Sequence, residues 1–182
     1  MKTISKTLLA GLTVLALSAC GSSGNQQPST QSSSRADNTP THSVPVKSSS
    51  SACKLLADHG GKGKNMVFRC HINTVLKDSI AKGDLESMPI SFGGNGKYRT
   101  NATARSFGND EAASCERAVT NALKSLQNRV NKEGGRRVTE AVSYRAGSNG
   151  RFDAKSYAPA GYADCIVATF QSRAVMRGSV GR

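Results

Sequence analysis

The residues of this 182-residue chain best suited to metal chemistry are its cysteines and histidines. Cys53, His59, Cys70 and His71 lie within nineteen positions and would together supply the two thiolates and two imidazoles of a tetrahedral zinc site. Their spacing matches none of the usual zinc motifs, and the lysine-containing stretch 60–64 would place positive charge beside the cation. We therefore expect disulfide bonds and no metal here, and keep zinc as the alternative.

Cys20 follows a segment with the layout of a secretory signal peptide. Two lysines precede an apolar core at residues 8–17, which runs into the tetrapeptide Leu17-Ser18-Ala19-Cys20. The tetrapeptide resembles the lipobox of bacterial lipoproteins, in which the cysteine is acylated and the preceding signal peptide is cleaved. The resemblance implies removal of residues 1–19 and a lipid anchor at Cys20. Ser22 resembles the pattern of lipoproteins sorted to the outer membrane, so we expect a domain anchored there that faces the periplasm.

Residues 20–50, which begin with the lipidated cysteine, have the composition of a disordered tether. Residues 21–50 contain ten serines and three prolines but no aromatic residue, leucine or isoleucine. Such a segment buries too little apolar surface to offset the entropy that it would lose on ordering. We expect residues 51–182 to form a single domain.

The cysteines beyond the tether form an even set of four: Cys53, Cys70, Cys115 and Cys165. In an exported chain the oxidising compartment favours two disulfides, and four cysteines allow three connectivities. We favour Cys115–Cys165, which would join a helix to a later strand, and Cys53–Cys70, which would close a local loop.

One segment, from about residue 110 to residue 132, has the periodicity of an amphipathic helix. Asn109 is placed to cap its N-terminus, Asp110 and Glu111 suit the positive end of the helix dipole, and Gly134 is placed to end it. Its apolar residues recur at spacings of three and four: Ala112, Cys115, Ala118, Val119, Ala122, Leu126 and Val130.

Alternating apolar and polar residues predict strands around this helix. The predicted strands cover 137–144, 162–170 and 173–180, with weaker patterns at 66–75 and 89–92. Glu140 interrupts the apolar face of the first strand, Gln171 and Ser172 form a tight connection between the next two, and residues 147–161 have the composition of a long loop. The expected fold class is α+β, with one main amphipathic helix packed on a small antiparallel sheet and stapled by disulfides.

The sequence lacks the common catalytic motifs. Neither Gly-x-Ser-x-Gly nor His-Glu-x-x-His occurs. The segment 91–98 matches a phosphate-binding loop only in part, because Ser91 replaces its first glycine and Tyr98 replaces the serine or threonine that would hold magnesium. We therefore expect no enzyme and no cofactor. An uncharacterised hydrolase, with a titratable group near His59 or His71, is the alternative.

Positive charge dominates the chain, with 25 Lys and Arg against 12 Asp and Glu. Residues 51–182 hold 21 of the basic and 11 of the acidic residues, a net charge of +10. The densest group, Arg129, Lys132, Arg136 and Arg137, surrounds the end of the predicted helix, where the helix dipole favours cations. It is either a solvated surface or a patch for a polyanion such as lipopolysaccharide, an acidic cell-wall polymer or nucleic acid. Few aromatic residues are interleaved with these cations, so nucleic acid is not expected.

The segments Ser114-Cys115-Glu116-Arg117-Ala118, Ala122–Gln127 and Lys132–Gly135 follow one another along the predicted helix and its end. Together with a cysteine in a late strand, Cys165, and the segment 177–180, they resemble a family of small exported bacterial proteins often named "excinuclease ATPase subunit". The likeness spans roughly residues 79–180. Because the phosphate-binding loop is incomplete, the resemblance implies no ATPase.

More distantly, the pattern of helix, glycine-rich stop and strand resembles the YbjQ-type small α+β domain. It also resembles the outer-membrane sensor lipoprotein of the Rcs pathway, which has a lipid anchor, a flexible linker and a disulfide-stapled domain. The chain departs from the small exported family in its lipobox and linker, in the segment with Cys53 and Cys70, and in having Arg136-Arg137 where Asn-Ala is usual.

We therefore expect a non-catalytic envelope lipoprotein with a binding or sensing role at the periplasmic face of the outer membrane. The alternative is a polyanion-binding accessory protein that uses the basic residues at the helix end. The expected partners are the membrane, through Cys20, and an anionic envelope polymer or an envelope protein. The oligomeric state is left open.

Overall fold

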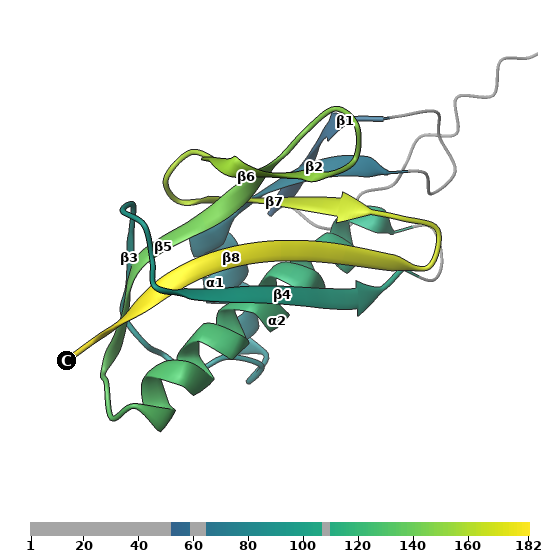
Figure 1. Ribbon diagram of the computed structural model, residues 1–182. Helices are drawn as coiled ribbons and strands as arrows, with labels where there is room; N and C mark the ends of the chain where they lie inside the picture. Colours follow the sequence, from purple (N-terminus) through teal and green to yellow (C-terminus); the bar gives the residue numbers. More distant parts are fainter. Residues whose placement is uncertain (1–51, 59–64, 107–109) are drawn as a thin grey trace, which may run out of the picture. The chain divides into compact units, whose positions relative to one another are not determined.

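The structure, a computed structural model, describes residues 52–58, 65–106 and 110–182 (Figure 1). Within these residues, which belong to one compact unit, the chain forms eight strands and two helices. In chain order they are β1 (Cys53–Ala57), β2 (Met66–His71), α1 (Ile72–Ala81), β3 (Ile90–Phe92), β4 (Tyr98–Arg105), α2 (Glu111–Lys132), β5 (Arg137–Ala146), β6 (Phe152–Tyr157), β7 (Tyr162–Val167) and β8 (Gln171–Gly181).

The strands form one large curled sheet in the order β1-β2-β7-β8-β5-β3, with β4 paired to β8 and β6 paired to β5. Every pairing is antiparallel except that of β3 with β5, which is parallel. The mixed α and β content is confirmed, and so is antiparallel pairing for most of the sheet; the expected small size of the sheet is wrong, and one pair is parallel. The difference arises because β8 is long enough to pair with β7 along its first residues, with β5 along its last, and with β4 along its other edge.

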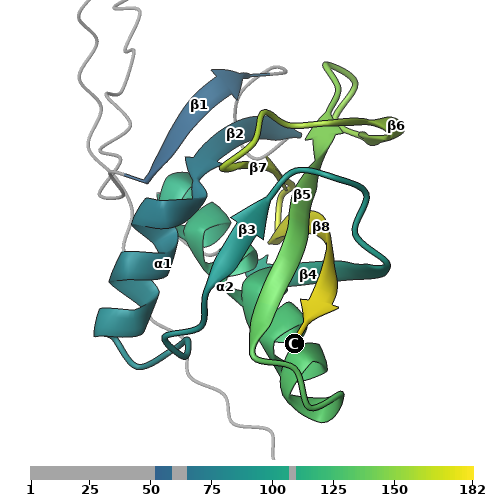
Figure 2. The ribbon, with the colours of Figure 1, turned by 90° about the vertical axis from the view of Figure 1, so that its left-hand side faces the viewer.

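Helix α2 is confirmed as the main helix, and it buries the apolar stripe that its sequence predicts. Ala118, Leu123 and Val130 are almost fully buried, and they pack in the core with inward residues of the sheet such as Val138 and Met176. Figure 2 shows both helices against the same side of the sheet. On the opposite side of β4 and β8, the described residues form no helix.

Asp110 is the N-cap of α2, because its Oδ1 accepts a hydrogen bond from the Ala113 N–H at 2.8 Å. The predicted cap, Asn109, lies outside the described residues. At the other end Gly134 has a φ of 68°, and the Gly135 N–H donates to the Val130 carbonyl. The glycine therefore ends the helix as predicted, by taking up a left-handed conformation.

Three predicted segments differ from the structure. The strand predicted at 66–75 ends at His71, and the chain passes directly into α1. The segment 147–161 is not simply a loop, since it contains β6. The tight connection between β7 and β8 lies at residues 168–170 instead of 171–172, where the Ala168 N–H donates to the Gln171 carbonyl.

Glu140 interrupts the apolar face of β5 because the strand has a bulge there. Glu140 has a φ of 52°, and the register with β8 shifts between Thr139 and Val142. A bulge inserts one residue, so both Ala141 and Val142 are buried beyond it. The exposed glutamate is therefore compatible with a buried strand.

Both disulfides that the sequence favours are present in the structure. Cys115–Cys165 joins α2 to β7, with both cysteines fully buried. Cys53–Cys70 joins the directly paired positions of β1 and β2. Among the described residues, no helix has the length and apolar character needed to cross a membrane.

Candidate anion-binding surfaces

The zinc alternative is wrong, because Cys53 and Cys70 are joined in a disulfide and offer no thiolate. His71 lies at the start of α1, where its Nδ1 is 3.2 Å from the Thr74 Oγ1 and its ring meets the Tyr162 ring edge-on. Within the described ranges, no three His, Cys, Asp or Glu side chains are grouped as a metal site would require. His59 lies outside those ranges.

The four basic residues predicted as a polyanion site meet at one end of the domain, and we call them the helix-end patch. Arg129 and Lys132 lie in the last turn of α2, Arg136 follows the helix, and Arg137 begins β5. Gly134 turns the chain between the two pairs, and the Arg136 N–H donates to a carbonyl at the end of β8 at 2.8 Å. The patch therefore lies where α2 ends, β5 begins and β8 ends.

Arg129 is held in place by neighbouring side chains. Its Nε lies 2.6 Å from the Glu133 carboxylate, and its guanidinium lies over the Tyr98 ring, 4.2 Å from the ring centre. The Tyr98 hydroxyl donates to Glu133 at 2.9 Å. This hydrogen bond and the charge of Arg129 lower the pKa of the Glu133 carboxyl, and Tyr98 and Glu133 together raise the pKa of Arg129.

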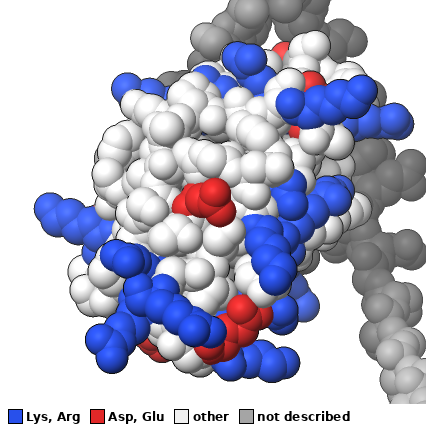
Figure 3. Space-filling model, turned by 60° about the vertical axis from the view of Figure 1, so that its left-hand side comes forward, with Lys and Arg blue, Asp and Glu red and all other residues white. Residues whose placement is uncertain are grey.

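The other three residues of the helix-end patch, Lys132, Arg136 and Arg137, are exposed. None of them takes part in an ion pair within the part of the chain that the structure describes. Figure 3 shows basic side chains gathered at the lower edge of the domain and along its right-hand side, with acidic side chains between those of the lower edge. The patch therefore offers at least three uncompensated positive charges to solvent.

A second group of cations lies on the side of the sheet opposite α1 and α2. β4 and β8 pair without interruption from Tyr98 to Arg105, and together they carry four arginines and no acidic residue. Arg99 lies directly opposite Arg177, and Arg173 is four residues from Arg177 on the same strand. Because side chains alternate across a sheet, all three point to the same face. We call Arg99, Arg173 and Arg177 the outer arginine cluster.

Aromatic rings lie among these arginines, which the sequence did not indicate. The Arg99 guanidinium is 5.1 Å from the centre of the Tyr144 ring, and that of Arg173 is 5.6 Å from the centre of the Phe152 ring. Tyr144 belongs to β5 and Phe152 to β6, so neither ring is close to its arginine in the sequence. Few aromatic residues therefore lie next to the cations in the sequence, as expected, but in the folded domain two rings contact these arginines.

The signal that could have indicated this cluster is a period of two. In β4 the exposed residues alternate as Arg99, Asn101, Thr103 and Arg105, and in β8 Arg173 and Arg177 are four apart. The sequence alone does not reveal that the two strands pair, because beyond Tyr98 the inner face of β4 carries only small residues, such as Ala102 and Ala104. Apolar periodicity therefore missed β4 altogether.

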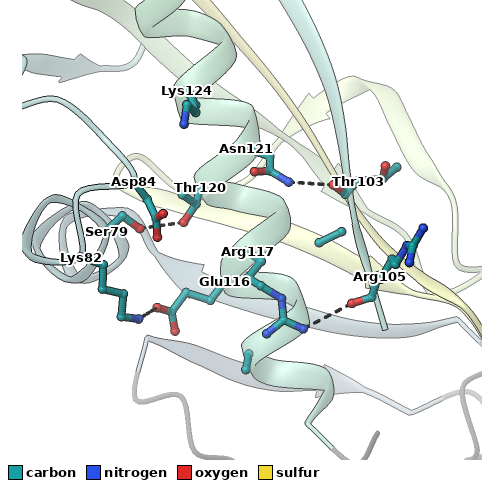
Figure 4. Close-up of a pocket in the computed structure, with 12 residues that line it drawn as sticks. Ser79, Lys82, Asp84, Thr103, Arg105, Glu116, Arg117, Thr120, Asn121 and Lys124 are labelled. Atoms are coloured by element: carbon teal, nitrogen blue, oxygen red, sulfur yellow. Dashed lines mark hydrogen bonds and ion pairs between the residues drawn. The ribbon is translucent and has the colours of Figure 1, made fainter. Parts of the chain in front are cut away.

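A groove of about 790 Å³ runs along α2, and Figure 4 shows its lining. On one side the Ser79 Oγ lies 2.7 Å from the Thr120 Oγ1, and on the other the Asn121 amide donates to the Thr103 carbonyl at 2.9 Å. These bonds join α2 to α1 and to the edge of β4. The groove includes an ion pair of Lys82 with Glu116, so its charge is mixed and it is a weaker candidate for an anion than the two surfaces above.

Comparison with known proteins adds no assignment to this geometry, because no family model, no curated protein and no solved structure matches the chain. The resemblance to small exported proteins and to sensor lipoproteins stays a prediction.

Proposed function

We propose that this chain is a bacterial lipoprotein, anchored through Cys20 in the outer membrane, whose domain binds an anionic component of the envelope at the periplasmic side. In this proposal residues 1–19 are the signal peptide and residues 20–50 are the tether. The domain acts by binding and not by catalysis. Its binding surface is the helix-end patch, and its partner is a polyanion such as lipopolysaccharide or an acidic cell-wall polymer.

The observation that carries the proposal is the grouping of Lys132, Arg136 and Arg137 without ion pairs among the described residues. The helix dipole explains cations in the last turn of a helix, and this accounts for Arg129 and Lys132. Its effect falls off beyond the last turn, so it does not account for Arg136 and Arg137. Like charges that are not compensated repel one another and reduce the stability of the folded domain. A binding role gives a reason for keeping them side by side.

Tyr98 and Glu133 support the binding role of Arg129. An arginine that lies on a ring and against a carboxylate is already oriented, so it loses less side-chain entropy when a ligand arrives. The remaining guanidinium N–H groups can donate to phosphate or carboxylate oxygens in the planar geometry that both groups prefer. The patch thus combines one oriented arginine with three exposed cations.

The test is retention on immobilised lipopolysaccharide of a variant with Arg129, Lys132, Arg136 and Arg137 all changed to Gln. We expect this variant to elute at clearly lower salt than the wild type, because screening weakens contacts between exposed charges. The matched control changes Lys54, Lys77, Lys124 and Arg145 to Gln, which removes the same charge from exposed positions elsewhere. If both variants elute alike, the helix-end patch is not the binding surface.

A further inference from the structure

The outer arginine cluster has a feature that the helix-end patch lacks: its charges face one another directly. Arg99 and Arg177 occupy opposite positions on neighbouring strands. Directly opposed like charges destabilise a sheet, by roughly the amount that an opposite pair would stabilise it. In the part of the chain that the structure describes, none of the three arginines forms an ion pair. The fold therefore keeps three guanidinium groups on one face of the sheet, without an ion pair among the described residues.

The groups that hold these arginines are all uncharged. The Arg173 Nε donates to the Asn101 Oδ1 at 2.8 Å, and the Arg177 Nη1 donates to the Asn95 Oδ1 at 2.7 Å. The Tyr157 hydroxyl donates to the same Asn95 oxygen at 2.9 Å. The neutral amides and the rings of Tyr144 and Phe152 orient the guanidinium groups and leave their full positive charge in place.

The backbone is shaped to bring Asn95 to Arg177. Asn95 lies in the connection between β3 and β4, and the next residue, Gly96, packs against Gly178 of β8. A Cβ on Gly96 would lie 2.4 Å from the Gly178 Cα, so a larger residue would push the connection away. Gly96 belongs to the segment 91–98, which matches a phosphate-binding loop only in part. This segment thus packs over β8 beside the outer arginine cluster.

Arg177 also has an unused donor. Its Nε is shielded from solvent and has no hydrogen-bond partner among the described residues. A buried donor without a partner costs free energy in the fold. Because this nitrogen is shielded, a ligand from solvent has to be met by the other nitrogens of the guanidinium group. Glu140 belongs to β5, the strand that pairs with the end of β8. Its carboxylate accepts from the Ser179 Oγ at 2.6 Å and, among the described residues, forms no ion pair with the cluster.

We propose that Arg99, Arg173 and Arg177 form a second anion site, which binds the phosphate groups of a phosphorylated glycan. Planar guanidinium groups match phosphate oxygens with paired N–H donors, and three of them spaced along one face of the sheet suit a glycan that carries more than one phosphate group. The choice of an envelope glycan rests on the proposed function. The phosphate specificity rests on the cluster itself and stands without that function.

The rings favour phosphate contacts over base stacking. Proteins that bind single-stranded nucleic acid offer free aromatic faces on which the bases stack. Here the Tyr144 ring, which is almost fully buried, carries Arg99, and the Phe152 ring carries Arg173. The rings therefore serve as supports for the arginines, and the donors above them contact the ligand.

The experiment measures binding of deacylated lipopolysaccharide to the full protein in a non-ionic detergent, before and after the glycan is enzymatically dephosphorylated. One variant changes Arg99, Arg173 and Arg177 to Gln, and its control changes three exposed arginines outside β4 and β8, Arg117, Arg145 and Arg151, to Gln. A milder variant, Arg177→Lys, keeps the charge but removes the planar donor set. Thermal melting of each variant without ligand verifies that it is folded.

We expect the triple variant to bind the phosphorylated glycan at least about tenfold more weakly than its control, and Arg177→Lys to lose about tenfold as well. Dephosphorylation of the glycan should abolish the difference between the triple variant and the control. The inference is overturned if the triple variant binds as its control does, if Arg177→Lys binds as the wild type does, or if dephosphorylation changes nothing. Tighter binding of a single-stranded oligonucleotide than of the glycan would also overturn it.

The two surfaces are tested separately, so their failures can be told apart. If the variant of the helix-end patch loses binding and the triple variant does not, the proposed function stands and the second site falls. If only the triple variant loses binding, the second site stands and the helix-end patch falls as the binding surface.

Discussion

Arginines in this domain have very different surroundings, and these decide what each can do. Arg69 is neutralised, because its guanidinium donates twice to Asp164, which is fully buried. Arg129 is partly neutralised by Glu133 at the surface. Among the described residues, Arg177 is oriented by neutral groups and forms no ion pair. The second and third kinds of surroundings orient a guanidinium that can still bind an external anion, while the first serves the fold.

The buried pair should therefore matter for stability. Asp164 accepts 2.8 Å and 3.1 Å hydrogen bonds from Arg69, and a 3.0 Å bond from the Ala146 N–H that ties the end of β5 to β7. We expect Asp164→Ala to lower the free energy of unfolding by about 3 kcal/mol, because it leaves the Arg69 charge unpaired. Urea unfolding measures this. The control Asp153→Ala, at an exposed position, should cost less than about 1 kcal/mol; similar losses would contradict the structural role of the pair.

Glu133 predicts a pH dependence at the helix-end patch. Its pKa is lowered in the folded chain, first by the Tyr98 hydroxyl and then by Arg129, so the unfolded chain binds a proton more readily. Its contribution to stability is therefore present at neutral pH and is lost as the pH falls through its folded pKa. We expect Glu133→Gln to lower the melting temperature at about pH 6 and to have a smaller effect near pH 3. An equal effect at both pH values would contradict this linkage.

At the scale of elements, strong periodicity made structure predictable. The apolar stripe of α2 is long enough to identify the helix, its buried face and its glycine stop from the sequence. The elements that were missed have weak stripes. In α1 only Ile72, Val75 and Ser79 are buried, and the helix starts directly after β2 with no intervening turn. The paired register of β6 with β5 covers only Tyr144 with Tyr157 and Ala146 with Phe152. Strand β6 therefore shows little apolar pattern in the sequence.

The two candidate surfaces also differ in whether the sequence could predict them. The helix-end patch is a local cluster of the sequence and could be predicted, because its four residues span only nine positions. The outer arginine cluster joins residues more than seventy positions apart, and only the pairing of β4 with β8 brings them together. Sequence periodicity carries no information on which strands pair.

The two disulfides should contribute unequally. Cys115–Cys165 closes a separation of 50 residues and Cys53–Cys70 one of 17. The loss of loop entropy in the unfolded chain predicts about 4 kcal/mol for the first and about 3 kcal/mol for the second. Urea unfolding of the double variants Cys115→Ala/Cys165→Ala and Cys53→Ala/Cys70→Ala should show the larger loss for the first. The reverse order would contradict the view that α2 is stapled to the sheet by the buried bridge.

At the scale of the whole molecule, the distribution of charge matters more than its total. Residues 51–182 carry a net +10, yet the acidic residues are unevenly spread. α1 and α2 carry both signs, whereas β4 and β8 carry only arginine. Two basic surfaces result, one at the end of α2 and one on the outer face of β4 and β8. In the proposed arrangement the tether holds both near an anionic membrane.

The lipid and the basic surfaces make different contributions to membrane binding, and salt separates them. Acyl chains contribute about 0.8 kcal/mol per buried methylene group, and two or more chains anchor a protein stably whatever the salt. Basic residues near an anionic surface contribute about 1 kcal/mol each, and this attraction fades as the Debye length shrinks from about 10 Å at 0.1 M to 3 Å at 1 M salt.

The most direct test of the account is therefore membrane fractionation of a lipid-free chain, washed at low and at high salt. The chain carries Cys20→Ala and is exported behind the leader of an ordinary secreted protein. We expect it to sediment with outer membranes at low salt and to be released in about 1 M salt, whereas the wild type stays bound in both. Retention of the lipid-free chain in high salt would contradict the anchor at Cys20, and its absence from membranes at low salt would contradict the anionic contact.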